Sequence, residues 1–285
     1  MNGIILIDKP KEYTSHDVVA IVKKITKEKV GHTGTLDPNA TGVLPLLVGK
    51  ATLISKYLIN HDKTYIATLK LGIKTDTADI EGNVIDIKEV PKLSERVAVD
   101  VLKSMIGKQT QVPPMYSAIK VNGKKLYEYA REGRTVEING RDIEIYNINL
   151  LELNIRDAEI VFEISCSKGT YIRTVCEEIA QKLNTVGYMK ELRRVRVGEF
   201  DISNSVDIKT IKENEKILEE KIISIEDFFE NKTKIELEDK ELELFLNGVK
   251  LNKQNVNEIY RIYNKNTFIG LGMIENNKLK RDVIL

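Results

Sequence analysis

Residues 31–42 read Gly-His-Thr-Gly-Thr-Leu-Asp-Pro-Asn-Ala-Thr-Gly. This stretch has neither helical nor strand periodicity, and its three glycines and one proline are typical of a shaped loop. Asp37 stands near its centre, and Pro38 biases the preceding aspartate towards an extended backbone. Because glycine lets a ligand approach the backbone closely, the loop is suited to presenting a carboxylate to a ligand. An ordinary Asp-Pro turn is the alternative at this point.

Clear periodicity frames this loop on both sides. Ile4 to Ile7 is a short apolar run, which indicates a buried strand that ends at Asp8-Lys9-Pro10. A helix should follow, with Thr14 or Ser15 as its N-cap, because apolar residues then recur at helical spacing: Val18, Val19, Ile21, Val22 and Ile25. After the loop, an alternating pattern predicts a strand whose buried face carries Tyr65, Ala67, Leu69 and Leu71.

The rest of the main region mixes helices and strands. Helical patterns cover Ser94 to Ile106 and a short piece near Leu126 to Arg131. Ile160 to Cys166 alternates as a strand and leads into a helix that we expect Thr170 to cap. The apolar stripe of that helix is Ile172, Val175, Cys176, Ile179, Ala180 and Leu183. Because the strands and helices do not alternate regularly, the pattern favours an α+β fold.

Length and texture predict two domains. A chain of 285 residues, at roughly 150 residues per domain, holds a little under two. Beyond about residue 230 the pattern changes to short strand-like pieces, such as Ile259 to Tyr263 and Thr267 to Gly272. We therefore expect a main domain over residues 1–230 and a small β-rich domain over residues 231–285.

The distribution of charge is more informative than its total. The net charge is only +1, with 31% charged and 42% hydrophobic residues. Between Lys103 and Arg141, however, eight basic residues face three glutamates, and a second basic cluster comprises Lys190, Arg193, Arg194 and Arg196. Such clusters bind nucleic-acid phosphates or form solvated faces.

Several classes of protein are excluded. The two cysteines, Cys166 and Cys176, do not form a CxxC pair, and three scattered histidines give no metal-ligand pattern. Gly42 to Lys50 lacks the spacing of a phosphate-binding loop, and Asp76 to Gly82 lacks that of a calcium loop. The apolar runs are too short for a signal peptide or a membrane span. We expect a protein of the reducing cytoplasm, without a metal site and without membrane association.

Several stretches together resemble one family. The loop at residues 31–42 closely resembles the catalytic loop of the TruB family of tRNA pseudouridine synthases, of the bacterial type. The other matching stretches occur in the family's order: Leu6 to Pro10, Lys63 to Ala67, Leu71-Gly72, Thr75 to Asp79, Pro113 to Lys120, Gly123 to Tyr127, Lys168 to Arg173 and Leu192 to Arg194. The resemblance runs from residue 4 to about residue 200.

The resemblance implies a fold and a substrate. The fold is that of the pseudouridine synthases, with a mixed, mainly antiparallel sheet flanked by helices and loops, and an RNA-gripping insertion at about residues 108–141. Residues 231–285 lie where the family often carries a PUA domain, a small β-rich module that binds RNA. The implied reaction isomerises the uridine at position 55, in the T-loop of tRNA, after that base has flipped out of its stack.

The resemblance also implies the catalytic residues. Asp37 matches the aspartate that is essential for breaking the glycosidic bond. Covalent attack and removal of a ribose proton both remain open, and both need an ionised carboxylate. Arg173 matches the arginine that pairs with this aspartate, where a surface arginine is the alternative. Tyr65 matches a tyrosine that stacks on the target base, although its strand position equally suits a core tyrosine.

Weaker correspondences concern substrate contacts. His32 matches a histidine that contacts the everted nucleotides, Asp79 could bond the uracil edge, and Leu192 could pack against the base. Lys9 and Lys120 are expected to contact phosphates or the loop, with a solvated side chain as the alternative for each. Lys124 and Lys125 are expected to bind phosphates. The expected partner is the T-arm of tRNA; no cofactor and no obligatory protein partner are expected, and the chain should be a monomer.

Two other functions stay open from the sequence. A non-catalytic RNA-binding or RNA-folding protein would keep the basic clusters, but it would not need Asp37, Tyr65 and Arg173 together. A synthase acting on ribosomal RNA within a guide-RNA particle shares these motifs. Such proteins usually carry long basic extensions, whereas this chain begins at its first strand. The compact form therefore favours the stand-alone enzyme.

Overall fold

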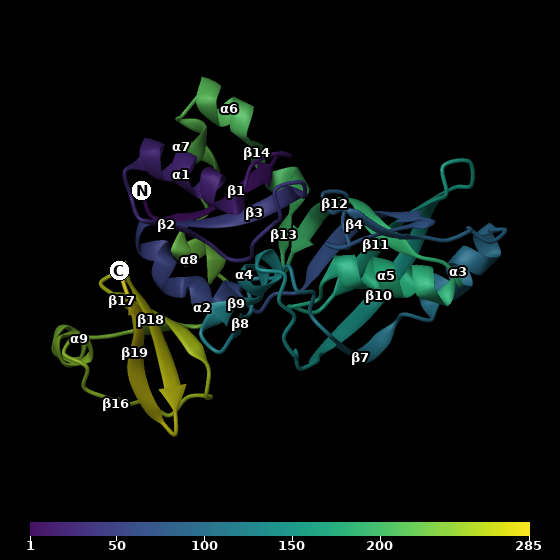
Figure 1. The fold of residues 1–285 in the computed structure, drawn as a ribbon. Helices are drawn as coiled ribbons and strands as arrows, with labels where there is room; N and C mark the ends of the chain where they lie inside the picture. The colour runs from purple at the N-terminus through teal and green to yellow at the C-terminus, as the bar shows by residue number, and fades with distance from the viewer.

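The computed structural model describes residues 1–285 and places a long mixed sheet at the centre of the molecule (Figure 1). The sheet has ten strands in the order β14-β1-β3-β12-β4-β11-β10-β7, with β2 paired to β3 and β13 to β12. These strands are β1 (Gly3–Lys9), β2 (Val30–His32), β3 (Thr41–Val48), β4 (Lys63–Leu71), β7 (Gly107–Gln111), β10 (Arg141–Asn154), β11 (Glu159–Cys166), β12 (Gly187–Val197), β13 (Phe200–Asp201) and β14 (Val206–Asp207). Only β1 with β14 and β3 with β12 pair in parallel. The expected mixed, mainly antiparallel sheet of an α+β fold is therefore confirmed.

Helices cover the two halves of this sheet separately (Figure 1). The helices of the main region are α1 (Ser15–Thr26), the 3-10 helices η1 (Gly49–Ile54) and η2 (Ile202–Asn204), α2 (Ser55–Leu58), α3 (Glu95–Lys103), α4 (Leu126–Arg131), α5 (Ile172–Lys182), α6 (Ile208–Glu213), α7 (Ile217–Lys221) and α8 (Ile225–Phe228). Helix α1 packs on β2 and β3, whereas α3 and α5 pack on β10 and β12. No helix of the chain is both long and apolar enough to cross a bilayer.

The ends of two helices test the expected N-caps. Helix α1 is capped by Thr14, whose hydroxyl accepts from the backbone N–H of Asp17 at 3.0 Å, while the Asp17 carboxylate accepts from Thr14 N–H at 2.8 Å. This reciprocal arrangement satisfies two donors at once. For α5 the expectation was wrong: Tyr171 is the N-cap, and the Thr170 hydroxyl instead donates to the Ser167 carbonyl at 2.9 Å.

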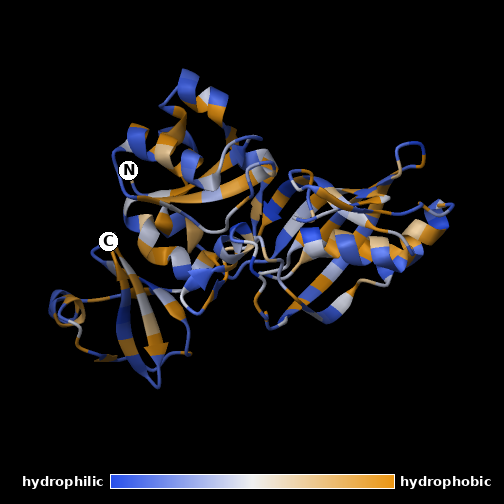
Figure 2. Ribbon diagram, in the orientation of Figure 1, coloured by the Kyte–Doolittle hydropathy of each residue, from blue (hydrophilic) through white to orange (hydrophobic).

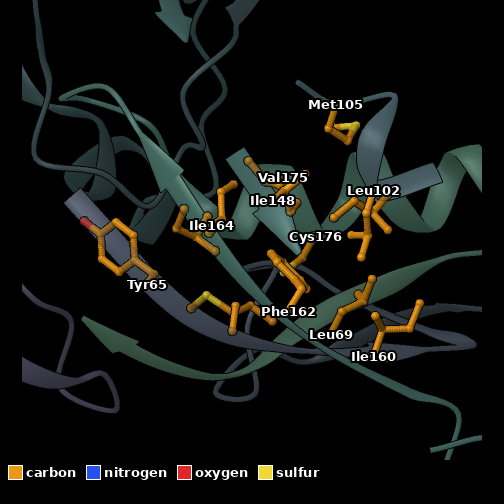
Figure 3. Close-up of a cluster of buried hydrophobic side chains, with 14 of the residues drawn as sticks. Tyr65, Leu69, Leu102, Met105, Ile148, Ile160, Phe162, Ile164, Val175 and Cys176 are labelled. Atoms are coloured by element: carbon orange, nitrogen blue, oxygen red, sulfur yellow. The ribbon is translucent and has the colours of Figure 1, made fainter. Parts of the chain in front are cut away.

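The alternating patterns of the sequence mark the buried faces correctly. Along β4 every second residue from Lys63 to Leu71 is buried, and the predicted apolar stripe of α5 is buried throughout. Figure 2 shows the same alternation of hydrophobic and hydrophilic residues along the strands and helices. Their apolar side chains belong to the largest apolar cluster, of 22 residues, between α5, α3 and the sheet (Figure 3). The periodicity of the sequence thus correctly predicted which faces of β4 and α5 are buried.

The segment expected to grip RNA leaves the main sheet and returns to it. Strand β7 ends at Gln111, which is the partner of Arg141 at the start of β10. The part outside the sheet is therefore residues 112–140, which we call the insertion, and the first residues of the expected 108–141 segment belong to β7. It holds the hairpin of β8 (Lys120–Val121) and β9 (Lys124–Lys125), followed by α4 at the bounds expected for it. A second small hairpin joins β5 (Ile73–Thr75) and β6 (Val84–Ile87).

A separate five-stranded sheet forms the C-terminal region, drawn in yellow in Figure 1. Its elements are β15 (Lys234–Glu236), α9 (Asp239–Leu246), β16 (Leu251–Asn252), β17 (Ile259–Asn264), β18 (Thr267–Glu275) and β19 (Lys278–Ile284). It has an apolar cluster of its own around Phe245, yet Leu271 and Val283 pack into a cluster shared with β1 and β3. We propose that a second domain begins near residue 231 and rests on the first through this shared cluster.

Candidate active site

A cavity of about 700 Å³ opens where the loop at residues 31–42, the insertion and the start of α5 meet. Four of the residues that the sequence analysis singled out line it: Asp37, Tyr65, Arg173 and Leu192. They come from the loop, β4, α5 and β12, which are far apart in the chain. The fold therefore gathers the expected catalytic residues around one space.

Arg173 connects the loop carboxylate to a second carboxylate. Its Nη2 lies 3.3 Å from Asp37 Oδ2, and its Nη1 lies 3.4 Å from Asp79 Oδ2. The guanidinium is nearly buried, with 9% of its side chain exposed, whereas 43% of the Asp37 side chain is exposed. A buried guanidinium has few alternative positions, so it orients the Asp37 carboxylate towards the cavity. Arg173 is thus not the surface arginine that was its alternative.

Asp79 lies behind Arg173 and does not line the cavity. Its Oδ1 accepts from the Thr77 hydroxyl at 2.6 Å and from the Glu81 backbone N–H at 3.1 Å, while its Oδ2 faces Arg173. Both carboxylate oxygens are therefore occupied within the protein. Asp79 holds Arg173, and the uracil contact expected for it stays a prediction.

Lys9 anchors the loop at residues 31–42 through hydrogen bonds to backbone carbonyls. Its ammonium donates to the carbonyls of Pro10 at 2.9 Å, Tyr13 at 2.7 Å and Pro38 at 3.1 Å, and the residue is fully buried. Burial lowers the pKa of Lys9 to about 8, although the neighbouring Asp37 carboxylate opposes the shift. Of the two contacts expected for Lys9, the loop contact is present. Its burial excludes a contact with an RNA phosphate in this conformation.

Two further side chains hold the same loop, and the sequence analysis missed both roles. The buried Ser15 hydroxyl donates to the Leu36 carbonyl at 3.0 Å and accepts from the Leu36 N–H at 2.9 Å. Arg194, which is 1% exposed, donates to the carbonyls of Val43 at 2.9 Å and Gly34 at 3.1 Å. Of the two roles left open for the second basic cluster, the solvated face is excluded for Arg194 by its burial.

Glycine is required where β3 leaves the loop. Gly42 has φ +110°, and a Cβ atom there would lie 2.1 Å from the Arg194 carbonyl oxygen. A side chain at this position would therefore push β3 away from β12. Because Arg194 on β12 donates to the loop, the parallel contact between these two strands also helps to position Asp37.

Tyr65 lines the cavity from the buried face of β4. The residue is 8% exposed, and burial raises the pKa of its hydroxyl. Figure 3 shows Tyr65 at one end of the largest apolar cluster, with its hydroxyl pointing away from the other labelled side chains. Leu192 and Met189 line the cavity as well. The ring therefore belongs to the core and to the cavity wall at once, so the two interpretations of Tyr65 do not compete.

Gln111 holds the start of α5, a role that the sequence did not indicate. Its side-chain amide donates to the Tyr171 carbonyl at 3.2 Å and accepts from the Tyr171 N–H at 2.8 Å. Gln111 is 2% exposed, and the N-cap residue Tyr171 makes no capping bond with its own side chain. Because Arg173 follows two residues later, Gln111 helps to fix the guanidinium.

His32 lies on β2, outside the cavity wall. It is half-buried, and its ring meets the exposed His16 ring edge-on at a centroid distance of 5.5 Å. Burial lowers the pKa of His32, and His16 adds to this shift. The histidine can contact only those parts of a ligand that remain outside the cavity.

The three expected lysines of the insertion also lie outside the cavity wall. Lys120 is exposed on β8. Lys124 pairs with Glu132 and lies 4.9 Å from the centre of the Tyr129 ring, and Lys125 Nζ lies 3.3 Å from the Tyr127 hydroxyl. Their expected contact with phosphates stays a prediction.

Comparison with protein families gives two consecutive matches. Residues 22–172 match the N-terminal domain of the TruB family pseudouridylate synthases, and residues 173–230 match the C-terminal domain of tRNA pseudouridylate synthase B. Among curated proteins, the chain is 46% identical to a tRNA pseudouridine synthase B of Clostridium tetani, with 95% of each chain covered. It is 43% identical to one of Clostridium novyi over the full length of both.

Solved structures with the same fold belong to larger assemblies. The crystal structure of a Cbf5-Nop10-Gar1 complex contains a chain that matches with a TM-score of 0.70 and 26% identity, covering 99% of this chain and 83% of that one. A structure of an H/ACA RNP bound to a substrate RNA containing 2′-deoxyuridine matches with a TM-score of 0.69 and 24% identity, covering 99% and 85%.

Proposed function

Because this chain belongs to the TruB family of pseudouridylate synthases, we propose that it isomerises the T-loop uridine at position 55 of tRNA, with Asp37 as the catalytic carboxylate. The chain is an isomerase that converts uridine to pseudouridine in tRNA, as its relatives are named to do. The choice of the T-loop uridine, the flipping of its base and the role of Asp37 are the parts that we propose.

The ion pair between Asp37 and Arg173 carries the proposal for catalysis. The reaction detaches uracil from C1′ of the ribose and rejoins it through carbon, so it needs an ionised carboxylate beside the sugar. Asp37 is the only cavity carboxylate in an ion pair, and the pair at 3.3 Å holds it at the end of a loop tied down by Lys9, Ser15 and Arg194. Such pre-organisation spares the enzyme the cost of placing the group during the reaction.

The shape of the cavity supports base flipping. A uridine stacked in RNA cannot reach a carboxylate at the wall of a cavity of about 700 Å³, so the nucleotide must leave the stack. Tyr65 and Leu192 offer an aromatic and an aliphatic surface in the same wall. These surfaces replace the neighbours that the base loses, since aromatic stacking stabilises an extruded base by about 1–3 kcal/mol.

The comparisons favour a stand-alone tRNA enzyme over a guide-RNA particle subunit. Relatives named tRNA pseudouridine synthase B reach 46% identity with nearly complete coverage, whereas the chain from the Cbf5-Nop10-Gar1 complex is 26% identical. We therefore propose that the chain acts as a monomer on the T-arm of tRNA, in the cytoplasm. The non-catalytic alternative has no support from a relative of this kind.

The proposal is tested by mapping the product. An unmodified tRNA transcript is incubated with the protein, and pseudouridine is located by carbodiimide treatment and primer extension. Wild type should give a single new stop at the T-loop uridine, and Asp37→Asn should give none. Asp86→Asn, an exposed carboxylate on β6, is the matched control and should retain the stop. A stop at another nucleotide, or one that survives Asp37→Asn, would refute the proposed site or residue.

A further inference from the structure

The wall of the active-site cavity carries more positive than negative side chains. Two carboxylates line it, Asp37 and Asp142. Asp37 is paired with Arg173, and Asp142 accepts from the Thr110 hydroxyl at 3.2 Å. The basic residues of the wall are Lys63, Arg141, Lys168, Arg173 and Arg194. Arg173 is paired with Asp37, and Arg194 is buried under the loop. Lys63, Arg141 and Lys168 are the wall cations that remain without a carboxylate partner.

Lys63 is the most enclosed of these remaining cations. It begins β4 two residues before Tyr65, and side chains two apart on a strand point to the same face. Lys63 therefore points to the face on which Tyr65 lines the cavity. It is 9% exposed, forms no ion pair, and its ammonium donates to the backbone carbonyl of His61. Burial lowers the pKa of Lys63, and the nearby Arg194 charge acts in the same direction.

Lys168 lies at the same end of the cavity. It is exposed in the loop between β11 and α5, and its Nζ donates to Asn60 Oδ1 at 2.6 Å. Lys63 and Lys168 thus bond to the adjacent residues Asn60 and His61, and the two charges are close enough for Lys168 to disfavour the charged form of Lys63. Neither lysine forms an ion pair with a carboxylate, although Asp62 acts on the pKa of Lys63 in the direction opposite to Lys168.

The nearest acidic residue does not cancel these charges. Asp62 raises the pKa of Lys63 more than Lys168 lowers it, but burial and the Arg194 charge outweigh Asp62. The Asp62 carboxylate accepts from the Tyr146 hydroxyl at 3.1 Å. It does not line the cavity. An enclosed ammonium without a counter-charge lowers stability, so its presence beside the site is explained if a ligand supplies the anion.

We propose that Lys63 and Lys168 form a binding site for one phosphodiester of the RNA strand next to the flipped uridine. The inference rests on the proposed function. Uracil and ribose are neutral, so the phosphodiester is the only anionic group that the nucleotide brings to the cavity. Along β4, Lys63 and Tyr65 are about 7 Å apart, and the base and its adjoining phosphate are separated by a comparable length.

The site gives the flipped nucleotide a fixed direction. With the base against Tyr65 and the phosphate at Lys63 and Lys168, the ribose lies between them, and its C1′ is held beside Asp37. Phosphate contacts position a nucleic acid without reading its sequence. This pair therefore contributes register and affinity, while recognition of the base belongs to the opposite end of the cavity.

The test neutralises the phosphate and the lysines separately. Three T-arm stem-loop RNAs are compared: an unmodified one, one with a methylphosphonate on the 5′ side of the target uridine, and one with it on the 3′ side. Each binds to wild type, to Lys63→Met, to Lys168→Ala and to the double variant. Lys92→Ala, an exposed lysine without an ion pair, is the matched control for Lys168→Ala, and Lys63→Arg keeps the charge.

One of the two methylphosphonates should raise the Kd of wild type about tenfold, as expected for the loss of one charge-assisted hydrogen bond. The same modification should leave the Kd of the double variant unchanged. The slope of log Kd against log salt concentration should fall by about 0.7–0.9 in the double variant, which corresponds to one phosphate. Lys92→Ala should behave as wild type, and Lys63→Arg should retain most of the affinity.

Two results would overturn the inference. One is that each methylphosphonate changes the Kd of wild type and of the double variant by the same factor; the other is that neither changes the Kd of wild type. Thermal unfolding of Lys63→Met shows whether this variant still folds. If it does not fold, Lys168→Ala still tests the site. Conversion of the unmodified RNA by wild type is scored separately, so failure of the proposed function is recognised by its absence.

Discussion

Replacing Gln111 by methionine tests whether the start of α5 positions the catalytic arginine. The change keeps the length of the side chain and removes both hydrogen bonds to the Tyr171 backbone, of 3.2 and 2.8 Å. At about 0.5–1.5 kcal/mol net for each bond, the free energy of unfolding should fall by about 1–3 kcal/mol. Tyr171 is only half-buried, so water can reach its freed groups, which favours the lower half of this range. The unfolding temperature should fall by a few degrees.

The same change should lower kcat more than it raises KM. Arg173 lies two residues after Tyr171 and holds Asp37 at 3.3 Å, so a loosened helix start displaces the pair within the cavity. A displacement of about 1 Å at a reacting group costs up to about a hundredfold in rate, and we expect a loss of kcat of at least about tenfold. Gln111 is buried and none of the proposed RNA contacts involves it, so KM should stay within about twofold of wild type.

Gln111→Glu provides a rescue that depends on pH. A protonated carboxyl group can donate to the Tyr171 carbonyl and accept from its N–H, as the amide does, whereas the ionised group cannot donate. Burial and the facing carbonyl disfavour the ionised form, so the pKa of the new group should be raised in the folded state. Its contribution is then fully present below the unfolded pKa of about 4.3 and is lost as pH rises through the folded pKa.

Steady-state kinetics on a tRNA transcript, together with thermal unfolding, measure these effects. The ratio of the kcat of Gln111→Glu to that of wild type should rise between pH 8 and pH 5.5, and the ratio for Gln111→Met should stay flat. If Gln111→Met unfolds and reacts as wild type does, Gln111 does not hold the helix. If Gln111→Met loses stability but keeps its kcat, then Gln111 stabilises the fold and does not position Arg173.

Three further outcomes are expected. Tyr65→Phe should bind T-arm RNA as wild type does, whereas Tyr65→Ala should lose about 1–3 kcal/mol of binding free energy; equal binding of both variants, measured by filter retention, would exclude stacking as a source of affinity. The pKa of Lys9 is lowered to about 8 in the folded protein. Above this pH the Lys9 amine is protonated more fully in the unfolded chain than in the folded one. In urea titrations, the difference in unfolding free energy between wild type and Lys9→Met should therefore rise between pH 8 and about 10. A difference that falls over this range would contradict the lowered pKa. Neutralising Lys124 and Lys125 together should make the salt dependence of RNA binding shallower, and an unchanged slope would remove both from the interface.

Local signals in the sequence predicted the loop, β4 and α5, but not β12, which carries Leu192 and Arg194. The alternation from Tyr65 to Leu71 predicted the buried face of β4, and the spacing of apolar residues predicted the stripe of α5. The glycines and the proline around Asp37 predicted a shaped loop, although residues 31–32 and 41–42 at its two ends belong to β2 and β3. The choice of cap for α5 failed: Tyr171 is the N-cap, and the Thr170 hydroxyl donates to the Ser167 carbonyl.

The sequence by itself determined several strands and helices, the loop and the family resemblance that pairs Asp37 with Arg173, but it did not indicate β3, β10 or β12. These features depend on residues within a few positions of one another, or on motifs whose order can be compared. Only the tertiary structure decided which charges are internal. Lys9 and Arg194 look like surface cations in the sequence, yet each donates to loop carbonyls; Arg194 reaches Gly34 across 160 positions of the chain. This hydrogen bond exists because β12 lies beside β3 in the sheet. The order of the strands depends on the packing of the whole chain, so it cannot be read from any local sequence pattern.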